Sequence, residues 1–491
     1  MRFTVCALMV ILAAPAPSAL KAQDTPSAAL VSGPAVDTLR LTLTEALAQA
    51  QPASEQVGIA QAEVRRTQGA QMQTRSALLP QISLGPQYTM VLESPYEGLF
   101  GGGSSGGANP FTASNQWRLG GSASISLFNL SQWSQLGASG DAIRVSQLQL
   151  SQQQALTILT VASAYYDAAL SAQLLSITEF TLAQAEKTLS DVTLGRAVGA
   201  QSEFEQLRAR VARDNQIPVV TRARANRDIA VTRLKQLLDV PLATEIVLLT
   251  PLDDREDPGT LPGDVATLLT GADTTVAARA VVRTAQETVA LNEKLTAAAG
   301  QQWIPTMTTS MNYNRAGYST AFFPTNSQFG NDWTLSAVLN WPLFTSGRIT
   351  GAKRQANANL DAARLRAKLT GEQAALDNET VEARLREAVD NIRATASVVE
   401  QAMRAYAIAE LRYAEGISTQ TELQDVRLQL EQARANQAQA ARDAQVARLR
   451  KALLPYLPLG TADGAALTTS AVTSTGAAAQ AVTGAATPAR R

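Results

Sequence analysis

The sequence predicts a mainly α-helical protein with transmembrane β-strands, built from a duplicated unit of helix, strand, strand and long helical hairpin. Three observations predict this fold: landmarks that recur about 220 residues apart, four segments with strict alternation, and two long proline-free stretches. A side-chain period of two indicates strands, whereas long runs of good helix formers favour helix. Four strands per chain cannot close a barrel in lipid, where every edge must be paired. Three copies would complete a 12-stranded trimeric β-barrel.

The composition excludes several classes of function. The chain has 491 residues, no histidine, one cysteine, and 42 Lys and Arg against 42 Asp and Glu. Without histidine there is no Ser-His-Asp machinery and no His-ligated zinc, and near-zero net charge disfavours nucleic-acid binding. Carboxylates such as Glu179, Glu186 or Glu372 are expected on helix surfaces, where the sequence suggests no pocket for catalysis. We expect no enzyme, no catalytic residues, no metal and no cofactor.

Residues 1–22 are predicted to be a secretory signal peptide. Arg2 provides a positive start, an apolar run follows over 5–14, and small residues lead to a cleavage site near 19–22. This run is too short to span a bilayer. Cys6 lies inside it, so we expect a mature chain without cysteine.

Three pairs of landmarks define the duplication. They are Leu79-Pro80-Gln81-Ile82 and Ile304-Pro305-Thr306-Met307, Asn115-Gln116-Trp117 and Asn331-Asp332-Trp333, and Glu203-Phe204 with Arg208 and Glu422-Leu423 with Arg427. The same order at a nearly constant offset indicates a repeated unit. We expect a first repeat over 23–240, an equatorial linker over 241–275, a second repeat over 276–455 and a disordered Ala/Thr/Gly-rich tail over 456–491.

The strands are expected at about 81–92, 115–128, 306–314 and 332–344. Apolar residues such as Ile82, Leu84 and Leu335 alternate with small or polar ones such as Ser83 and Thr334. This alternation fits strands with one face toward lipid and one toward a wet lumen, although a soluble antiparallel sheet has the same period. The long Gly/Ser/Asn/Pro-rich loops over 93–114 and 314–331 favour the membrane interpretation.

Long helical hairpins are expected over about 139–238 and 352–454. Their first helices would each be roughly 80 to 90 Å long at 1.5 Å per residue, so they must form coiled coil or the wall of a tube. In the last helix, an apolar seam follows 3-4 spacing from Leu423 through Leu430 to Ala447. Arg427 and Glu431 are placed on the outer, solvated face.

Each hairpin reverses at a short Gly/Ser/Thr segment, over 195–202 and 416–421. Thr419 or Thr421 is expected to cap the new helix. Glu422 and Asp425 are three residues apart and so share a helix face. On an isolated helix this pair is a solvated first turn, whereas in a threefold assembly it becomes a ring of six carboxylates that acts on permeating ions.

The chain resembles the TolC-like outer-membrane efflux family over nearly all of its mature length. The resemblance rests on four segments: Leu41-Thr42-Leu43-Thr44-Glu45-Ala46-Leu47, Leu79-Pro80-Gln81-Ile82-Ser83-Leu84, Leu339 to Arg348 (LNWPLFTSGR), and Tyr413-Ala414-Glu415-Gly416 with the Glu422 and Asp425 pair. It implies a homotrimer in the outer membrane, with an α-helical barrel extending through the periplasm. A mixed equatorial belt would surround the helices, including Asp239 to Asp273.

By the same resemblance, Glu422 and Asp425 match an acidic ring at the periplasmic aperture, Tyr413 matches a tyrosine of its closing network, and Glu203 matches the acidic partner in the first repeat. The chain departs from the family at two places. Ser418 stands where a well-known member has an arginine of the closing latch, and residues 125–131 lack the Pro and Gly-Gly of the family's WPLFDGG motif.

The resemblance implies a passive exit duct of a tripartite efflux or type I secretion system. A periplasmic adaptor would dock at the turns, marked by Gly199, Ser202, Gly416 and Thr419, and would link the duct to an inner-membrane transporter. Transport energy would come from that transporter, since the chain has no GxxxxGK[ST] motif. The resemblance does not distinguish drugs, metal ions and proteins as substrates. The alternative is a periplasmic coiled-coil scaffold without a pore.

Overall fold

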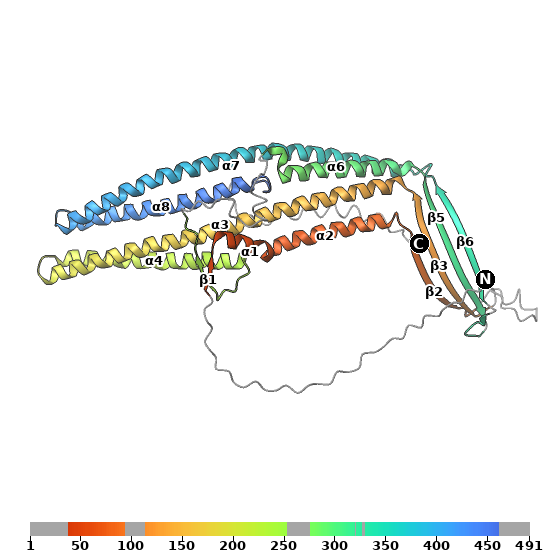
Figure 1. Ribbon diagram of the computed structural model, residues 1–491, viewed down its shortest axis with the longest axis horizontal. Helices are drawn as coiled ribbons and strands as arrows, with labels where there is room; N and C mark the ends of the chain where they lie inside the picture. The colour runs from red at the N-terminus through yellow and green to blue at the C-terminus, as the bar shows by residue number, and fades with distance from the viewer. Residues whose placement is uncertain (1–37, 94–112, 253–274, 320, 327–328, 461–491) are drawn as a thin grey trace, which may run out of the picture.

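The computed structural model describes residues 38–93, 113–252, 275–319, 321–326 and 329–460. Long helices run along most of the molecule, and a sheet stands at one end (Figure 1). The predicted signal peptide over 1–22 lies outside the described residues, as do most of the first strand loop, much of the equatorial linker and the tail after residue 460.

The sheet has four antiparallel strands in the order β2-β3-β5-β6. Their bounds are β2 Gln81–Met90, β3 Asn115–Phe128, β5 Thr306–Ser319 and β6 Phe329–Asn340. The second hairpin is shifted from its expected limits. β5 continues beyond residue 314 because Arg315 to Gly317 still pair with Asn331 to Phe329, and β6 ends at Asn340, before Trp341-Pro342.

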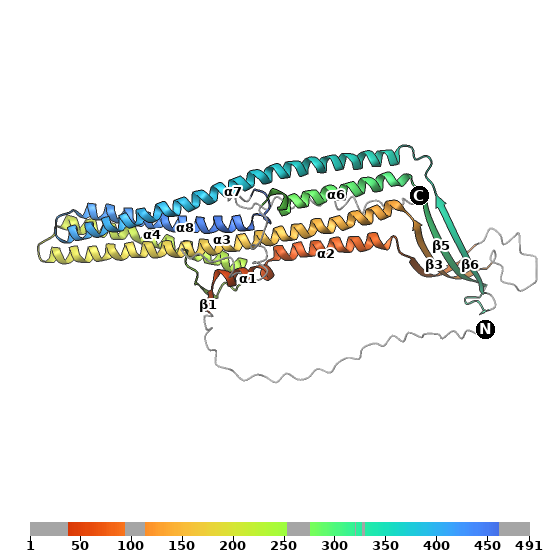
Figure 2. The same cartoon turned by 45° about the horizontal axis from the view of Figure 1, so that its top comes forward.

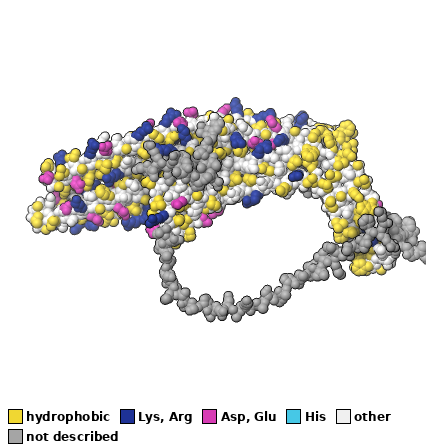
Figure 3. Space-filling view, viewed as in Figure 1, with side chains coloured by type: hydrophobic (Ala, Val, Ile, Leu, Met, Phe, Trp, Pro, Cys, Tyr) yellow, Lys and Arg dark blue, Asp and Glu magenta, His cyan; other side chains and the backbone are white. Residues whose placement is uncertain are grey.

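The two faces of the sheet differ sharply. Ile82, Leu84 and Leu335 lie on one face and are largely exposed. On the opposite face, hydroxyl groups pair across strands, Ser83 with Ser122 at 2.7 Å and Ser310 with Ser336 at 2.8 Å. The space-filling view shows hydrophobic side chains gathered over the sheet, with charged ones scattered along the helices (Figure 3). We call the face that carries Ile82, Leu84 and Leu335 the apolar face, and the face that carries the paired serines the polar face.

Both outer strands of the sheet have one open edge. β2 pairs only with β3, and β6 pairs only with β5 among the described residues. An unpaired edge presents a row of N–H and C=O groups that hydrocarbon does not satisfy.

Helices continue the chain from the strands. They are α2 Glu55–Ser76, α3 Leu130–Ala197, α4 Glu203–Leu237, α6 Ala280–Gly300, α7 Arg348–Ala414 and α8 Gln420–Leu453. The order α2-β2-β3-α3-α4 recurs as α6-β5-β6-α7-α8 (Figure 2). α3 has 68 residues and α7 has 67, so each is about 100 Å long. α3 begins nine residues before the expected position 139 because Asn129 caps it, accepting from Gln132 N at 3.2 Å.

One described helix, α3, contains a window apolar enough to cross a membrane by length and composition. Most of that window is buried inside the protein, as in the core helix of a water-soluble region.

The main core lies midway along the helices, where α1 Leu43–Ala53 and the parallel pair of β1 Thr38–Leu41 and β4 Glu245–Leu248 pack on them. The Tyr165 hydroxyl ties this layer together: it donates to Leu41 O and accepts from Thr250 N, both at 3.1 Å. The short turns η2 Val276–Ala278 and η3 Gln301–Trp303 flank α6.

A buried ion pair joins the second repeat to the end of the described chain. Arg279 is fully buried, donates to Asp377 Oδ2 at 2.7 Å and also contacts Asn378 Oδ1 and Leu457 O. Ala280 N donates to Pro455 O at 2.7 Å. This junction therefore joins the start of α6, the middle of α7 and the residues after α8.

The seam of α8 is buried at Leu423, Leu430 and Ala447, in agreement with its 3-4 spacing. The placement of Arg427 on a solvated outer face was wrong, since this side chain is only 8% exposed. It reaches α3, as described below.

Candidate functional site

The two helical hairpins reverse at tight turns that require glycine. Gly199 has φ of +79° and Gly416 has φ of +71°, the left-handed region in which a side chain is strained. Each glycine follows the last turn of a long helix, α3 or α7. Both glycines expected at the turns therefore end a helix, as glycine does at many helix C-termini.

A hydroxyl side chain caps the helix after each turn. Ser202 Oγ accepts from Glu205 N at 3.2 Å, and Thr419 Oγ1 accepts from Glu422 N at 3.3 Å. The cap of α8 is thus Thr419 and not Thr421. Such caps satisfy one of the free N–H groups of a first helical turn.

An arginine before each turn faces a glutamate after it. Arg196 Nη2 lies 3.4 Å from Glu203 Oε2, and Arg412 Nη1 lies 3.8 Å from Glu422 Oε1. Both pairs are exposed, so each contributes little to stability, within the 0 to about 1 kcal/mol typical of surface pairs. They place a positive charge beside Glu203 and beside Glu422.

Asp425 is exposed one helical turn after Glu422, and no ion pair to it is found among the described residues. The two carboxylates therefore differ: Arg412 partly offsets the charge of Glu422, while that of Asp425 has no such neighbour.

Tyr413 is half-buried at the edge of a small core formed by Tyr406, Ala409, Leu423 and Leu430. Burial raises the pKa of its hydroxyl, and the nearby carboxylates Glu205 and Asp191 raise it further, while Arg427 opposes them. The structure thus places Tyr413 between α7 and α8 of the second hairpin, near Glu205 and Asp191 of the first.

Polar contacts between the hairpins were missed by the sequence reasoning. Arg208 of α4 donates to Thr421 of α8, and Arg427 of α8 donates to Thr188 of α3 at 3.1 Å. With its side-chain amide turned over to exchange O and N, buried Gln420 donates to Glu205 Oε2 at 2.7 Å. The signal was present, because Arg208 and Arg427 are equivalent landmarks of the repeat. Both turn out to cross to the other hairpin.

Ser418 lies in the turn between α7 and α8, and its buried hydroxyl has no hydrogen-bond partner among the described residues. The contacts of Arg208 and Arg427 lie within a few helical turns of it and join the same two hairpins.

Within the described residues, no group of three or more His, Cys, Asp or Glu side chains is arranged to hold a metal ion.

An elongated bundle of helices about 100 Å long, continued by an antiparallel sheet with one apolar face, defines the class of outer-membrane channels with a periplasmic helical part. The chain belongs to the outer membrane efflux protein family, whose model matches residues 43–239 and 271–453. It is an outer-membrane efflux channel, located in the outer membrane with its helices extending into the periplasm. A search of curated proteins found no match.

Solved structures with the same fold include three outer-membrane proteins. The outer membrane channel CmeC of Campylobacter jejuni has a TM-score of 0.69 at 15% identity, over 84% of this chain and 86% of that one. VceC of Vibrio cholerae has a TM-score of 0.67 at 18% identity, over 85% and 96%. The outer membrane channel MtrE of Neisseria gonorrhoeae, in an open state, has a TM-score of 0.68 at 19% identity, over 84% and 88%.

Proposed function

We propose that three copies of this chain form a passive exit duct, with a 12-stranded β-barrel in the outer membrane and an α-helical barrel in the periplasm. The duct conducts substrates from an inner-membrane transporter and a periplasmic adaptor to the exterior, as part of a tripartite efflux or type I secretion system. Family membership supports the channel, and the fold shared with outer-membrane channels supports the architecture.

The observation that carries the proposal is the sheet. Its apolar face is exposed in one protomer, and the edges of β2 and β6 are open. Pairing β2 of one copy with β6 of the next satisfies all edges and turns the apolar face to lipid. A soluble scaffold would leave that face in water, so this observation disfavours the alternative.

The periplasmic aperture is proposed at the helical turns. Glu422 and Asp425 supply the acidic ring, Glu203 stands at the equivalent place in the first repeat, and Tyr413 packs between α7 and α8. Carboxylates around an opening attract cations and repel anions.

The adaptor is proposed to dock on the turns marked by Gly199, Ser202, Gly416 and Thr419. Val198 and Ile417 are exposed at the tips of these turns. Apolar side chains at a tip, beside polar caps, are suited to a protein partner.

Planar-bilayer recording of the purified trimer tests the aperture. We expect Glu422→Ala with Asp425→Ala to change the conductance and to weaken block by La³⁺ added from the helical side, because the carboxylates that attract the cation are lost. The control is Glu387→Ala with Asp390→Ala, an exposed pair three residues apart on α7, which should leave both unchanged. Unchanged conductance and block in the first variant would refute the aperture.

Extraction separates the duct from the scaffold. The duct requires detergent for release from membranes and runs as a trimer in mild SDS, whereas a scaffold is released by high salt. Release by salt would refute the proposal.

A further inference from the structure

The polar face of the sheet carries two charged side chains among its described strand residues, Arg118 on β3 and Asp332 on β6. The other members of that face are neutral. They are Gln81, Ser83, Gly85, Gln87 and Thr89 on β2; Gln116, Gly120, Ser122, Ser124 and Ser126 on β3; Thr306, Thr308, Ser310, Asn312, Asn314, Ala316 and Tyr318 on β5; and Gly330, Thr334, Ser336, Val338 and Asn340 on β6.

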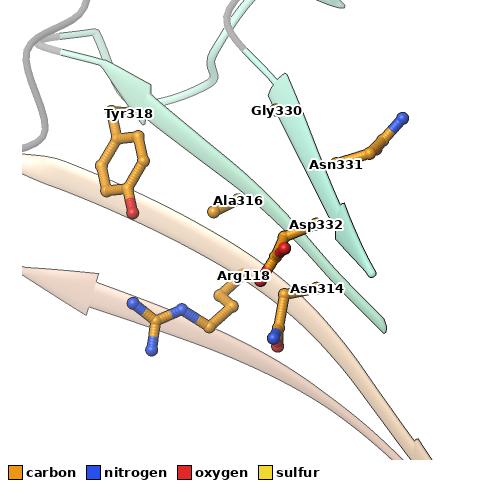
Figure 4. Close-up of a pocket in the computed structure, with 7 residues that line it drawn as sticks. All are labelled: Arg118, Asn314, Ala316, Tyr318, Gly330, Asn331 and Asp332. Carbon is orange, nitrogen blue, oxygen red and sulfur yellow. The ribbon is translucent and has the colours of Figure 1, made fainter. Parts of the chain in front are cut away.

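Arg118 and Asp332 line one hollow with Asn314 and Tyr318. Figure 4 shows the side chains of Arg118, Asn314 and Asp332 on the same side of the sheet, with Asn331 directed away. The hollow lies near the end of the strands far from the helices, because β3 starts at Asn115 and leads into α3 after Phe128.

The two charges do not neutralise each other directly. Arg118 is paired with Ala316, and Asp332 is paired with Asn314 in the adjacent row, so two strand spacings separate them. Both side chains are exposed, and no hydrogen bond or ion pair of either is found within the described part of the chain. Each is therefore available to a solute.

The side chains also differ in reach. The guanidinium of Arg118 stands on a stem of three methylene groups, whereas the carboxylate of Asp332 follows a single one. On a surface otherwise made of small polar groups, Arg118 extends further from the wall. Its planar fork of donors matches carboxylate and phosphate oxygens.

We infer that Arg118 and its copies in the two other protomers form a ring of guanidinium groups in the outer half of the barrel lumen, which binds anionic solutes such as carboxylates and phosphates as they leave, while Asp332 opposes that binding. This inference rests on the proposed trimeric barrel. The ring of Arg118 side chains makes the outer mouth basic, opposite in sign to the acidic aperture proposed at the other end.

The dimensions of the barrel allow the ring to act across the lumen. Twelve strands about 4.8 Å apart and tilted by about 40° give a backbone radius on the order of 12 Å. The Debye length is about 10 Å in 0.1 M salt and about 3 Å in 1 M salt. The effect should therefore be strong in 0.1 M KCl and nearly absent in 1 M KCl.

The test is block of the current through the purified trimer by inorganic tripolyphosphate added from the barrel side. In 0.1 M KCl we expect Arg118→Gln to raise the half-blocking concentration at least fivefold and Asp332→Asn to lower it. In 1 M KCl the differences should disappear. The matched control is Arg315→Gln, which removes the same charge at a similar height on the apolar face, where Arg315 lies over the Phe329 ring.

The outcomes are distinct. Block that is unchanged in Arg118→Gln, or weakened as much in Arg315→Gln, refutes anion binding by the Arg118 ring. Neither result contradicts the proposed duct. A wild-type trimer without current refutes the duct and the ring together. Folding of each variant is checked by the SDS-resistant trimer, and Arg118→Lys should retain most of the block because it keeps the charge.

Discussion

Arg427 of α8 donates a hydrogen bond of 3.1 Å to the hydroxyl of Thr188 in α3, from a side chain that is only 8% exposed. The same hydroxyl donates to Gln184 O at 2.9 Å, so it is oriented to accept from the guanidinium. A buried charge is costly unless it is hydrogen-bonded, and Arg427 has no carboxylate in an ion pair among the described residues. The contact thus holds the second hairpin against the first.

Replacing Arg427 with methionine should loosen the two hairpins near the turns. Methionine retains much of the buried stem but loses the charged hydrogen bond, whose contribution is typically about 1.5 to 3 kcal/mol. We expect amide hydrogen exchange in the first turns of α8 to become about tenfold faster or more, with the sheet unchanged.

The control for this experiment is Arg404→Met, which removes an exposed arginine that pairs with Glu400 one turn away in α7. Its effect on exchange should be small. Equal exchange in wild type and Arg427→Met would show that Arg427 does not hold the hairpins.

Arg279→Ala should be strongly destabilising. The substitution leaves Asp377, itself 7% exposed, as an uncompensated buried charge, a change that typically costs 3 to 5 kcal/mol. Urea midpoints of the detergent-solubilised protein measure the loss. Arg364→Ala, which breaks an exposed pair with Glu293, should cost less than about 1 kcal/mol. Equal losses in the two variants would contradict the role assigned to the junction.

Local pattern was sufficient for the long elements and insufficient for the contacts between them. The period of two at Ile82 and Leu84, and the proline-free run before Gly416, depend only on neighbouring residues. β1 and β4 have four residues each and pair over 200 positions, so no local period marks them.

The candidate site divides in the same way. Gly416 and Thr419 follow from the chemistry of turns and caps. Arg427 lies four residues after Leu423 and three before Leu430, so its position shares the buried seam, and its charge was the reason for the wrong outward placement. The repeat offered a second sequence signal, because Arg208 occupies the equivalent position and also crosses to the other hairpin.

Leu335 and Thr334 allow a direct test of which face meets lipid. Leu335 is 75% exposed on the apolar face in the middle of β6, and its neighbour Thr334 lies on the polar face. Arginine at a lipid-facing midplane position costs about 2 to 4 kcal/mol, while lumen positions tolerate charge. We expect Leu335→Arg to reduce the outer-membrane trimer severalfold and Thr334→Arg to leave its amount near wild type. Equal amounts in the two variants would contradict the orientation of the sheet.

Glu431 of α8 should make stability depend on pH. Burial raises the pKa of its carboxyl, and a hydrogen bond from Thr181 offsets part of this effect. The folded state therefore binds the proton more tightly than the unfolded chain. Stability from this group is complete below the unfolded pKa of about 4.3 and falls as pH rises through the folded pKa.

Glu431→Gln removes this dependence, because the amide stays neutral. We expect the free energy of unfolding of the variant, measured in urea, to exceed that of wild type at pH 7.5 by less than about 1 kcal/mol, since the carboxyl is only half-buried, and to match it near pH 4. Glu400→Gln, at an exposed position on α7, should show no such gain. A gain of the same size at both pH values would mean that packing or the lost hydrogen-bond geometry, and not the buried charge, sets the effect of this residue.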